Sequence, residues 1–207
     1  LLDLIPLGKV FAKKKLGCRG VYLPVEVGPW SSVCSSLFFG QKSNAVYSAL
    51  NLIMDFYFSW DLEYARKVYP FLIEVAEFWE DYLVLEGDRY VALNDALGEQ
   101  YDASTDKNPI ITLALLRFLL KGIIAVAGEL GVDADRVPKW QDMLDRLSDY
   151  TTFERNGKTV YRLTESGPDW HEKRGMAALA PIYPSGEVGL GSDPERLQIA
   201  YHSFVEQ

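Results

Sequence analysis

An acidic stretch between two apolar segments holds the residues best suited to chemistry. Its sequence, YVALNDALGEQYDASTDKNP (residues 90–109), carries carboxyl groups at Asp95, Glu99, Asp102 and Asp106 and has no apolar periodicity. Carboxyl groups act as general acids and bases when their surroundings set their protonation states apart. Two interpretations follow: a solvated acidic loop, or a catalytic loop at the mouth of a helical barrel.

The other reactive side chains form no established motif. The segment DWHEKRG (169–175) places His171 beside Asp169 and Glu172, but this spacing matches no zinc pattern such as H-E-x-x-H. The chain also lacks a P-loop, a G-x-S-x-G elbow and a dinucleotide fingerprint. The sequence therefore predicts no metal site and no cofactor.

Composition narrows the class of partner. The chain has 207 residues, of which 48% are hydrophobic, enough for one globular domain with a core. Its net charge of -8 and its pI of about 4.8 disfavour a nucleic acid or an anionic membrane, because binding to either relies on Lys and Arg. We therefore expect neither partner, whereas a neutral ligand is compatible with this charge.

Targeting and redox signals are few. No secretory signal is visible, and the chain begins with Leu1, so the sequence leaves its localisation open between cytoplasmic and secreted or periplasmic. The longest apolar run (110–127) is interrupted by polar residues, which argues against a membrane span. Cys18 and Cys34 do not make a disulfide framework, so we expect two free thiols.

Apolar periodicity predicts a mainly α fold. Ser43 or Asn44, Asp61, Asn108 and Asp193 or Ser192 are the expected caps, and Pro109 occupies a first helical position. The third helix is apolar nearly all round, which is typical of burial on every side. The predicted helices span residues 43–60, 61–86, 110–130, 135–150 and 194–206.

Short strands and loops are expected elsewhere. Residues 1–42 are predicted to form opening loops and short strands, including a solvated turn at the lysines 13–15. Residues 89–93 alternate like a short strand. The segment 151–163 has the Asn-Gly signature of a tight β-hairpin.

A weak internal repeat suggests how the helices assemble. Residues 43–82 and 108–150 each predict a helix, a turn and a second helix that contains a tryptophan (Trp79 and Trp140). Repeated helix pairs with long loops on one side are typical of an α/α toroid or a helical solenoid. A tetratricopeptide array is disfavoured, because the spacing is about double its ~34 residues.

Four segments, taken in order, resemble the (α/α)6 barrels of six-hairpin glycosidases related to glycoside hydrolase family 95. GCRGVYLPVEVGPW (17–30) is similar to their Gly-x-Arg-Gly segment, and residues 38–84 to their helix pair. NDALGEQYDASTDKNP (94–109) occupies the place of their catalytic acid and a following Asp. LAPIYPSGEVG (179–189) resembles their Leu-x-x-Leu/Ile-Tyr-Pro-Gly segment.

This resemblance implies a single domain over residues 1–207, with helix hairpins over 43–207. The fold would be a partial (α/α)6 toroid with short β-strands in long rim loops. The sequence predicts fewer helices than a closed toroid contains. We therefore expect this chain to be part of a longer enzyme, or a shortened homologue that is inactive alone. The fucosidase members carry His-His-Asn-Thr-Asp where this chain has LPVEVGPW, which argues against L-fucosides.

The resemblance also implies site residues. Glu99 takes the position of the general acid, and Asp95 with Asn94 would orient it or hold a sugar hydroxyl. Asn-Asp also favours a plain turn, and Glu99 could be an exposed loop carboxylate. The remaining candidates for substrate binding share a loop position, and simple packing is the alternative for the aromatic ones. They are Glu26, Trp30, Tyr101, Asp106, Trp170 and His171.

The sequence thus predicts a glycoside hydrolase, or a fragment of one, that acts on oligo- or polysaccharides by acid/base catalysis with inversion. The second carboxylate would come from outside this chain. A non-catalytic carbohydrate-binding or scaffold domain is the first alternative, and a polysaccharide lyase is the second. An incomplete toroid would expose an apolar face, so we also expect self-association or packing against the remainder of the barrel.

Overall fold

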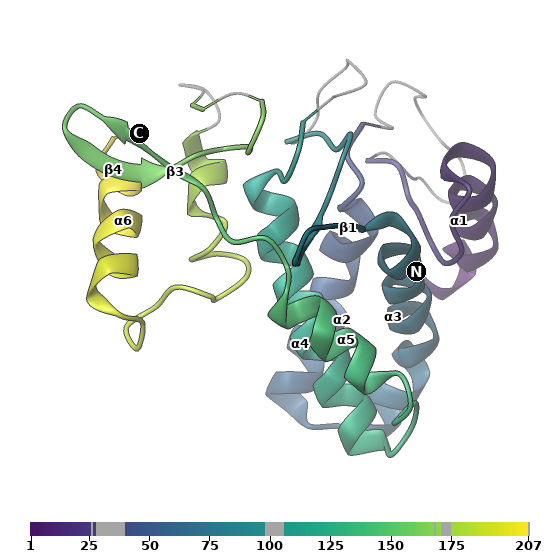
Figure 1. The fold of residues 1–207 in the computed structure, drawn as a ribbon. Helices are drawn as coiled ribbons and strands as arrows, with labels where there is room; N and C mark the ends of the chain where they lie inside the picture. Colours follow the sequence, from purple (N-terminus) through teal and green to yellow (C-terminus); the bar gives the residue numbers. More distant parts are fainter. Residues whose placement is uncertain (26, 28–39, 98–105, 168, 171–174, 207) are drawn as a thin grey trace.

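The computed structural model describes residues 1–25, 27, 40–97, 106–167, 169–170 and 175–206. In this part the chain is mainly helical, with two small antiparallel hairpins (Figure 1). The elements in order are η1 (Leu2–Leu4), α1 (Ile5–Phe11), η2 (Ala12–Leu16), α2 (Asn44–Ser59), α3 (Leu62–Tyr82), β1 (Val84–Glu86), β2 (Arg89–Val91), α4 (Ile110–Leu130), α5 (Val137–Asp145), β3 (Thr152–Arg155), β4 (Lys158–Tyr161), η5 (Gly175–Leu179) and α6 (Pro194–Val205).

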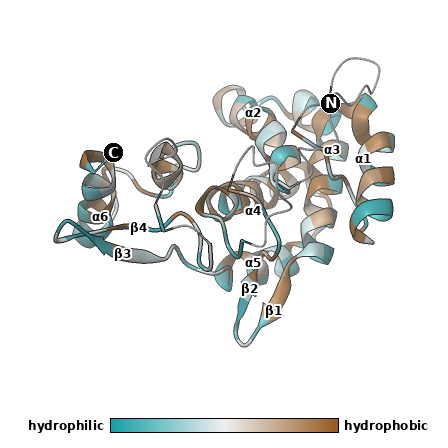
Figure 2. Ribbon diagram, turned by 90° about the horizontal axis from the view of Figure 1, so that it is seen from above, coloured by the Kyte–Doolittle hydropathy of each residue, from teal (hydrophilic) through white to brown (hydrophobic). Residues whose placement is uncertain are grey.

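Helix α4 lies in the middle of the molecule. Seen from above, α2, α3 and α5 surround it on three sides, and α6 with the β3–β4 hairpin lies on the fourth (Figure 2). The helix is long and apolar enough to cross a membrane, but 72% of its most apolar window is buried inside the protein. Core helices of soluble proteins share this property, so α4 is only a weak indication of a membrane span.

The helix pairs α2–α3 and α4–α5 form one core. Gly122 on α4 lets α2 approach closely, because a Cβ there would lie 2.6 Å from Ile53 Cγ2. Trp79 of α3 and Trp140 of α5 are fully buried within this core. Trp60, whose place in a predicted helix favours a core position, is instead 54% exposed, since it ends α2 in a left-handed conformation.

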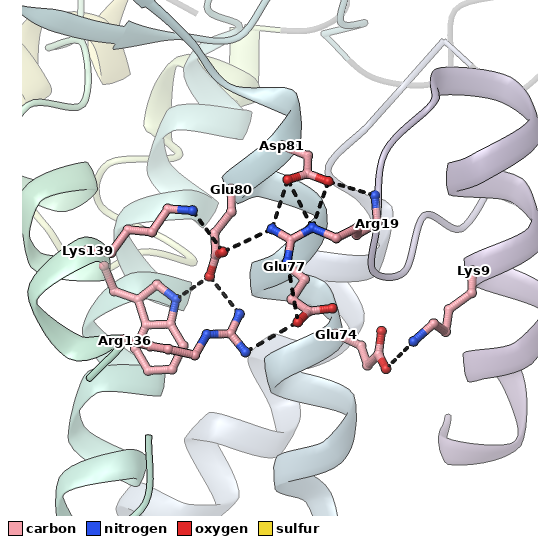
Figure 3. A network of polar contacts seen from close by, with 9 residues as sticks. Lys9, Arg19, Glu74, Glu77, Glu80, Asp81, Arg136 and Lys139 are labelled. Carbon is pink, nitrogen blue, oxygen red and sulfur yellow. Dashed lines mark hydrogen bonds and ion pairs between the residues drawn. The ribbon is translucent and has the colours of Figure 1, made fainter. Parts of the chain in front are cut away.

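The N-terminal segment is fastened to α3 by charge. Arg19 forms a two-pronged pair with Asp81, with its Nη2 2.9 Å from Oδ1 and its Nε 3.0 Å from Oδ2. Lys9 Nζ lies 2.6 Å from Glu74 Oε1. Glu80 of α3 pairs with Arg136 at the start of α5. The acidic side chains of α3 therefore bind the N-terminal segment on one side and α5 on the other (Figure 3). Ion pairs between distant segments thus join α1, α3 and α5.

Gly20 is where this segment meets the α3 backbone. Its φ is +66°, and a Cβ would lie 2.2 Å from Glu74 O and 2.4 Å from Phe78 N. We expect Gly20→Ala to lower the free energy of unfolding by roughly 2–4 kcal/mol, from backbone strain and overpacking together. Urea denaturation measures this.

Gly17 supplies a matched control for that measurement. Its φ is +74°, but a Cβ added there would meet nothing within 4 Å, so Gly17→Ala carries the backbone strain alone. We expect it to cost about 1–2 kcal/mol. Equal losses for the two variants would contradict the close contact at Gly20.

The C-terminal elements form a smaller unit with its own core. β3 pairs with β4 in the register Thr152↔Tyr161, and the turn residues Asn156 and Gly157 have φ of 50° and 74°, as an Asn-Gly hairpin requires. The apolar side chains of this second cluster come from α4, β4, α6 and the segments around them. They are Leu97, Ile110, Tyr161, Leu163, Ala178, Val188 and Ala200.

Several expected helix ends are confirmed. The Asp61 carboxylate accepts hydrogen bonds from the backbone N–H groups of Glu63 and Tyr64, and Asp193 accepts one from Arg196. The helix predicted over residues 110–130 ends at Leu130, with Gly131 after it in the left-handed conformation. Short-range hydrogen bonding sets all three ends, which is why the sequence predicts them.

Other expectations were wrong. The helix predicted to reach residue 86 ends at Tyr82, because residues 84–86 pair with β2 around a turn at Gly87. Residues 2–16, expected as loop and turn, are helical. Asn108 does not cap α4: Pro109 occupies the cap position, and no side chain caps that end.

Candidate functional site

The acidic loop is attached next to the N-terminal end of α4 by two paired backbone segments, the first stem (residues 92–95) and the second stem (residues 106–108). Asp95 N donates to Asp106 O at 3.1 Å, and Asn108 N donates to Ala92 O at 2.9 Å. The Asn108 side chain adds a third link, because its Oδ1 accepts from Ala92 N at 2.8 Å. Residues 98–105, with Glu99 and Tyr101, lie outside the described residues. The stems nevertheless fix where that segment leaves the fold and where it returns.

Asp95 is the anchor of the first stem. It is completely buried, and both of its carboxylate oxygens are used. Oδ1 accepts a hydrogen bond from Lys42 N at 2.7 Å, and Oδ2 accepts one from Thr112 Oγ1 at 2.6 Å. Thr112 lies on α4 and is itself fully buried. The Asp95 side chain therefore ties the loop to α4 and to the chain just before α2.

The charge of Asp95 has a nearby cationic partner. Lys42 is 6% exposed, and its Nζ donates to Gly40 O at 2.5 Å and to Asn94 O at 2.9 Å. Burial raises the pKa of Asp95 to about 6, although the hydrogen bonds from Thr112 and Lys42 oppose this. Burial lowers the pKa of Lys42, and the Asp95 carboxylate opposes that effect.

Asn94 and Asp106 differ in their exposure to solvent. Asn94 has a left-handed backbone (φ 51°) and is exposed, while its carbonyl accepts from Lys42. Asp106 is 8% exposed, and its Oδ2 finds no hydrogen-bond partner among the described residues. Burial raises the pKa of Asp106. A Cβ on Gly167 would lie 2.1 Å from Asp106 Oδ1, so the glycine makes room for this carboxyl group.

A cluster of charged side chains supports the second stem. Glu165 Oε2 accepts from Asn108 Nδ2 at 2.7 Å and from Arg89 Nη1 at 2.7 Å. Lys107 Nζ lies 3.1 Å from Glu165 Oε1. The hydrogen bond from Arg89 is the largest of the effects that lower the pKa of Glu165 to about 2. The carboxylate is therefore ionised at neutral pH and binds the stem to the strand β2.

Of the other predicted site residues, Trp170 is the one that the structure describes. Trp170 is half-buried in the second cluster; the Arg155 guanidinium lies 4.9 Å from its ring centroid, and the Phe153 ring centroid lies 6.3 Å away. Trp170 stands three positions after Gly167, so the chain holds the two Cα atoms within about 11 Å of each other. The remaining predicted site residues lie outside the described residues; they are Glu26, Trp30, Glu99, Tyr101 and His171.

Three residues that build this region were not predicted from the sequence: Lys42, Thr112 and Glu165. Lys42 lies just before α2 and Glu165 lies in an irregular segment, so no local pattern marks these two residues. Thr112 carries a weak signal, because it is a polar residue in the apolar first two turns of α4. Cys18 is a buried free thiol, and Cys34 lies outside the described residues.

No group of three or more His, Cys, Asp or Glu in the described ranges has the arrangement of a metal site. Asp95 and Glu165 are instead engaged with Lys42, Thr112, Arg89 and Lys107. What the stems provide is a firm attachment for a carboxylate-bearing loop, with a buried and partly unsatisfied carboxyl group, Asp106, beside it.

A helical core that presents an acidic loop on fastened stems is an arrangement suited to acid/base chemistry on a neutral ligand. Comparison with protein-family models places the chain more specifically. Residues 1–206 match the glycosyl hydrolase family 95 catalytic domain, so the chain belongs to this family. At the level of the family it is a glycoside hydrolase domain with a carbohydrate substrate. No curated protein matches the chain.

Proposed function

We propose that this domain hydrolyses glycosidic bonds in oligo- or polysaccharides by acid/base catalysis with inversion, with Glu99 as the general acid. The observation that carries the proposal is the pairing of Asp95 N with Asp106 O, which closes a loop with Glu99 inside it. A loop closed at its base loses less conformational freedom when it positions a catalytic group. Inverting enzymes hold their two carboxyl groups roughly 6.5–9.5 Å apart.

In this proposal Asp95 is a positioning residue. Both of its oxygens are bound within the protein and none of its surface is exposed, so it acts on the sugar only through the loop. Asn94 is exposed and can donate to a sugar hydroxyl. Asp106 lines the loop base, where its raised pKa keeps a larger share of it protonated than in an ordinary aspartate. Glu26, Trp30, Tyr101, Trp170 and His171 complete the proposed sugar contacts.

The second carboxyl group comes from outside this chain in the same proposal. The helix pairs α2–α3 and α4–α5 are then two hairpins of an (α/α)6 toroid that further hairpins close. The packing of α4 against α2, α3 and α5 supports this arrangement. The long rim loops of such a toroid lie on one side, and the segment 92–109 would be one of them.

The test is the release of reducing sugar from plant and bacterial polysaccharides and from aryl glycosides, with the longest natural chain that contains this domain. We expect release from at least one neutral substrate, with a product whose anomeric configuration is inverted in NMR at early time points. Retention of configuration would overturn the inverting mechanism. A folded protein that binds these sugars and releases nothing would favour the carbohydrate-binding or scaffold function.

A lyase is the less favoured alternative. A lyase removes a proton next to a uronate carboxylate, and the acidic loop repels such a substrate. The double bond in a lyase product absorbs in the ultraviolet, so the same reactions read at that wavelength distinguish the two activities. A rise in absorbance without hydrolysis would replace the proposed function.

Self-association is expected when the chain is studied alone. Helix α2 carries exposed aromatic side chains at its C-terminal end, with Phe58 83% and Trp60 54% exposed, and exposed apolar patches bind partners. Light scattering should give a mass above that of one chain, and Phe58→Lys should lower it. A single-chain mass for the unaltered protein would contradict this prediction.

A further inference from the structure

A second cleft lies apart from the acidic loop, where the linker between α5 and β3 meets β4 and the start of α6. Its volume is about 390 Å³, within the range of small-molecule sites. Asp149 and Tyr150 of the linker, Tyr161 of β4, and Asp193 and Arg196 at the start of α6 line it. None of these residues belongs to the stems around Asp95 and Asp106.

Tyr161 provides a polar group that the protein leaves available. It is only 3% exposed, and Tyr150 packs against its ring edge with 5.7 Å between centroids and 71° between planes. Its backbone N donates to Ser203 Oγ at 2.8 Å, which fixes its position on β4. Its hydroxyl makes no hydrogen bond to any other described residue. Although the ring is buried, the hydroxyl oxygen keeps contact with solvent, so a ligand in the cleft can bond to it.

Acidic and basic side chains are paired along the cleft. Arg196 Nη2 lies 3.3 Å from Asp149 Oδ2, and Arg196 Nε lies 3.8 Å from Asp193 Oδ2. Arg117 of α4 also lies close to the linker, with its Nη2 3.8 Å from Asp149 Oδ1 and its guanidinium 4.7 Å from the centre of the Tyr150 ring. Acceptors and donors are therefore held in place before any ligand arrives.

The balance of these groups selects the ligand. Asp149, Asp193 and Glu195 outnumber Arg196 among the charged lining residues, so an anion is disfavoured. A metal ion is disfavoured too, because the described acidic residues form no metal-binding group. A neutral compound with adjacent hydroxyl groups satisfies the carboxylates as a donor, and the guanidinium and the tyrosine as an acceptor.

We propose that this cleft is a second, non-catalytic binding site for a neutral sugar unit. The choice of a sugar as the ligand rests on the proposed function, whereas the location of the site rests on the cleft alone. The site borders the second apolar cluster, which also contains Leu97, two residues from Asp95. A bound sugar here would hold a longer saccharide on the same side of α4 as the hairpin β3–β4.

The test is titration of the full chain with methyl glycosides of neutral hexoses and pentoses, followed by NMR. We expect shifts of the backbone amide signals of Asp193 and Arg196 on binding of at least one glycoside. Tyr161→Phe removes only the hydroxyl and should weaken this binding about 3- to 10-fold, the effect of one lost hydrogen bond. Tyr201→Phe is the matched control, since Tyr201 lies on α6, is 60% exposed and does not line the cleft.

The outcomes separate this site from the proposed activity. Unchanged affinity in Tyr161→Phe, or an equal loss in Tyr201→Phe, would overturn the proposal. So would shifts of the same amides with inorganic phosphate in place of neutral glycosides. Hydrolysis without any binding at the cleft would refute the second site alone, whereas cleft binding without hydrolysis would refute the proposed function alone.

Discussion

Glu99→Gln is expected to lower kcat by about 10²- to 10⁴-fold, the usual contribution of a positioned general acid. Glutamine keeps the shape of the side chain but has no proton to give to the leaving oxygen. Substrate affinity should change little, because the amide still accepts and donates hydrogen bonds. Steady-state kinetics on the best substrate, with binding measured separately by calorimetry, gives both quantities.

A leaving group that needs no protonation supplies the control. Aryl glycosides with acidic phenols leave without a general acid, so Glu99→Gln should recover much of its rate on them. Asp102→Asn is the matched variant, since Asp102 lies in the same acidic stretch and has no assigned role. An equal loss in both variants, or full activity in Glu99→Gln, would remove Glu99 from the role of acid.

Asp95→Ala is expected to lower the free energy of unfolding by about 3–5 kcal/mol. The substitution leaves the Lys42 N–H and the Thr112 hydroxyl without their acceptor in a buried place, and it removes the opposite charge near Lys42. Urea denaturation measures the loss. Thr112→Val deletes one of these hydrogen bonds and should cost less, about 1–3 kcal/mol. An Asp95→Ala protein as stable as the original would show that Asp95 does not anchor the loop.

Asp95 also predicts how stability depends on pH. Its pKa is raised from 3.8 to about 6 in the folded protein, so the folded state binds this proton more tightly than the unfolded state. Its contribution to stability is complete below about pH 4 and is lost as the pH rises through 6, in total roughly 3 kcal/mol. Asp95→Asn should flatten the stability curve between pH 4 and 6.

Glu165 acts in the opposite direction. Its pKa is lowered to about 2, so its contribution is present above the usual glutamate pKa and is lost as the pH falls towards 2. The two groups therefore act in separate pH windows, which lets thermal denaturation at a series of pH values resolve them. A curve for Asp95→Asn that still falls between pH 4 and 6 would contradict the raised pKa of Asp95.

Much of the helical framework could be predicted because it depends on neighbours in the sequence. The all-round apolarity of α4 predicted its burial, the carboxylates of Asp61 and Asp193 predicted two helix starts, and Asn156–Gly157 predicted a hairpin. Caps, tight turns and amphipathic faces involve residues a few positions apart. The family resemblance came from the order of such segments, and the match over residues 1–206 confirms it.

The sequence by itself determined the helix pairs and the position of an acidic loop between two of them. Only the tertiary structure decided what holds that loop, because the partners of Asp95 come from residue 42 and from residue 112 on α4. The hydrogen bonds of Glu165 to Asn108 and Arg89 also join segments far apart along the chain. Such contacts exist only after the helices have packed, and burial then gives an ordinary aspartate its raised pKa.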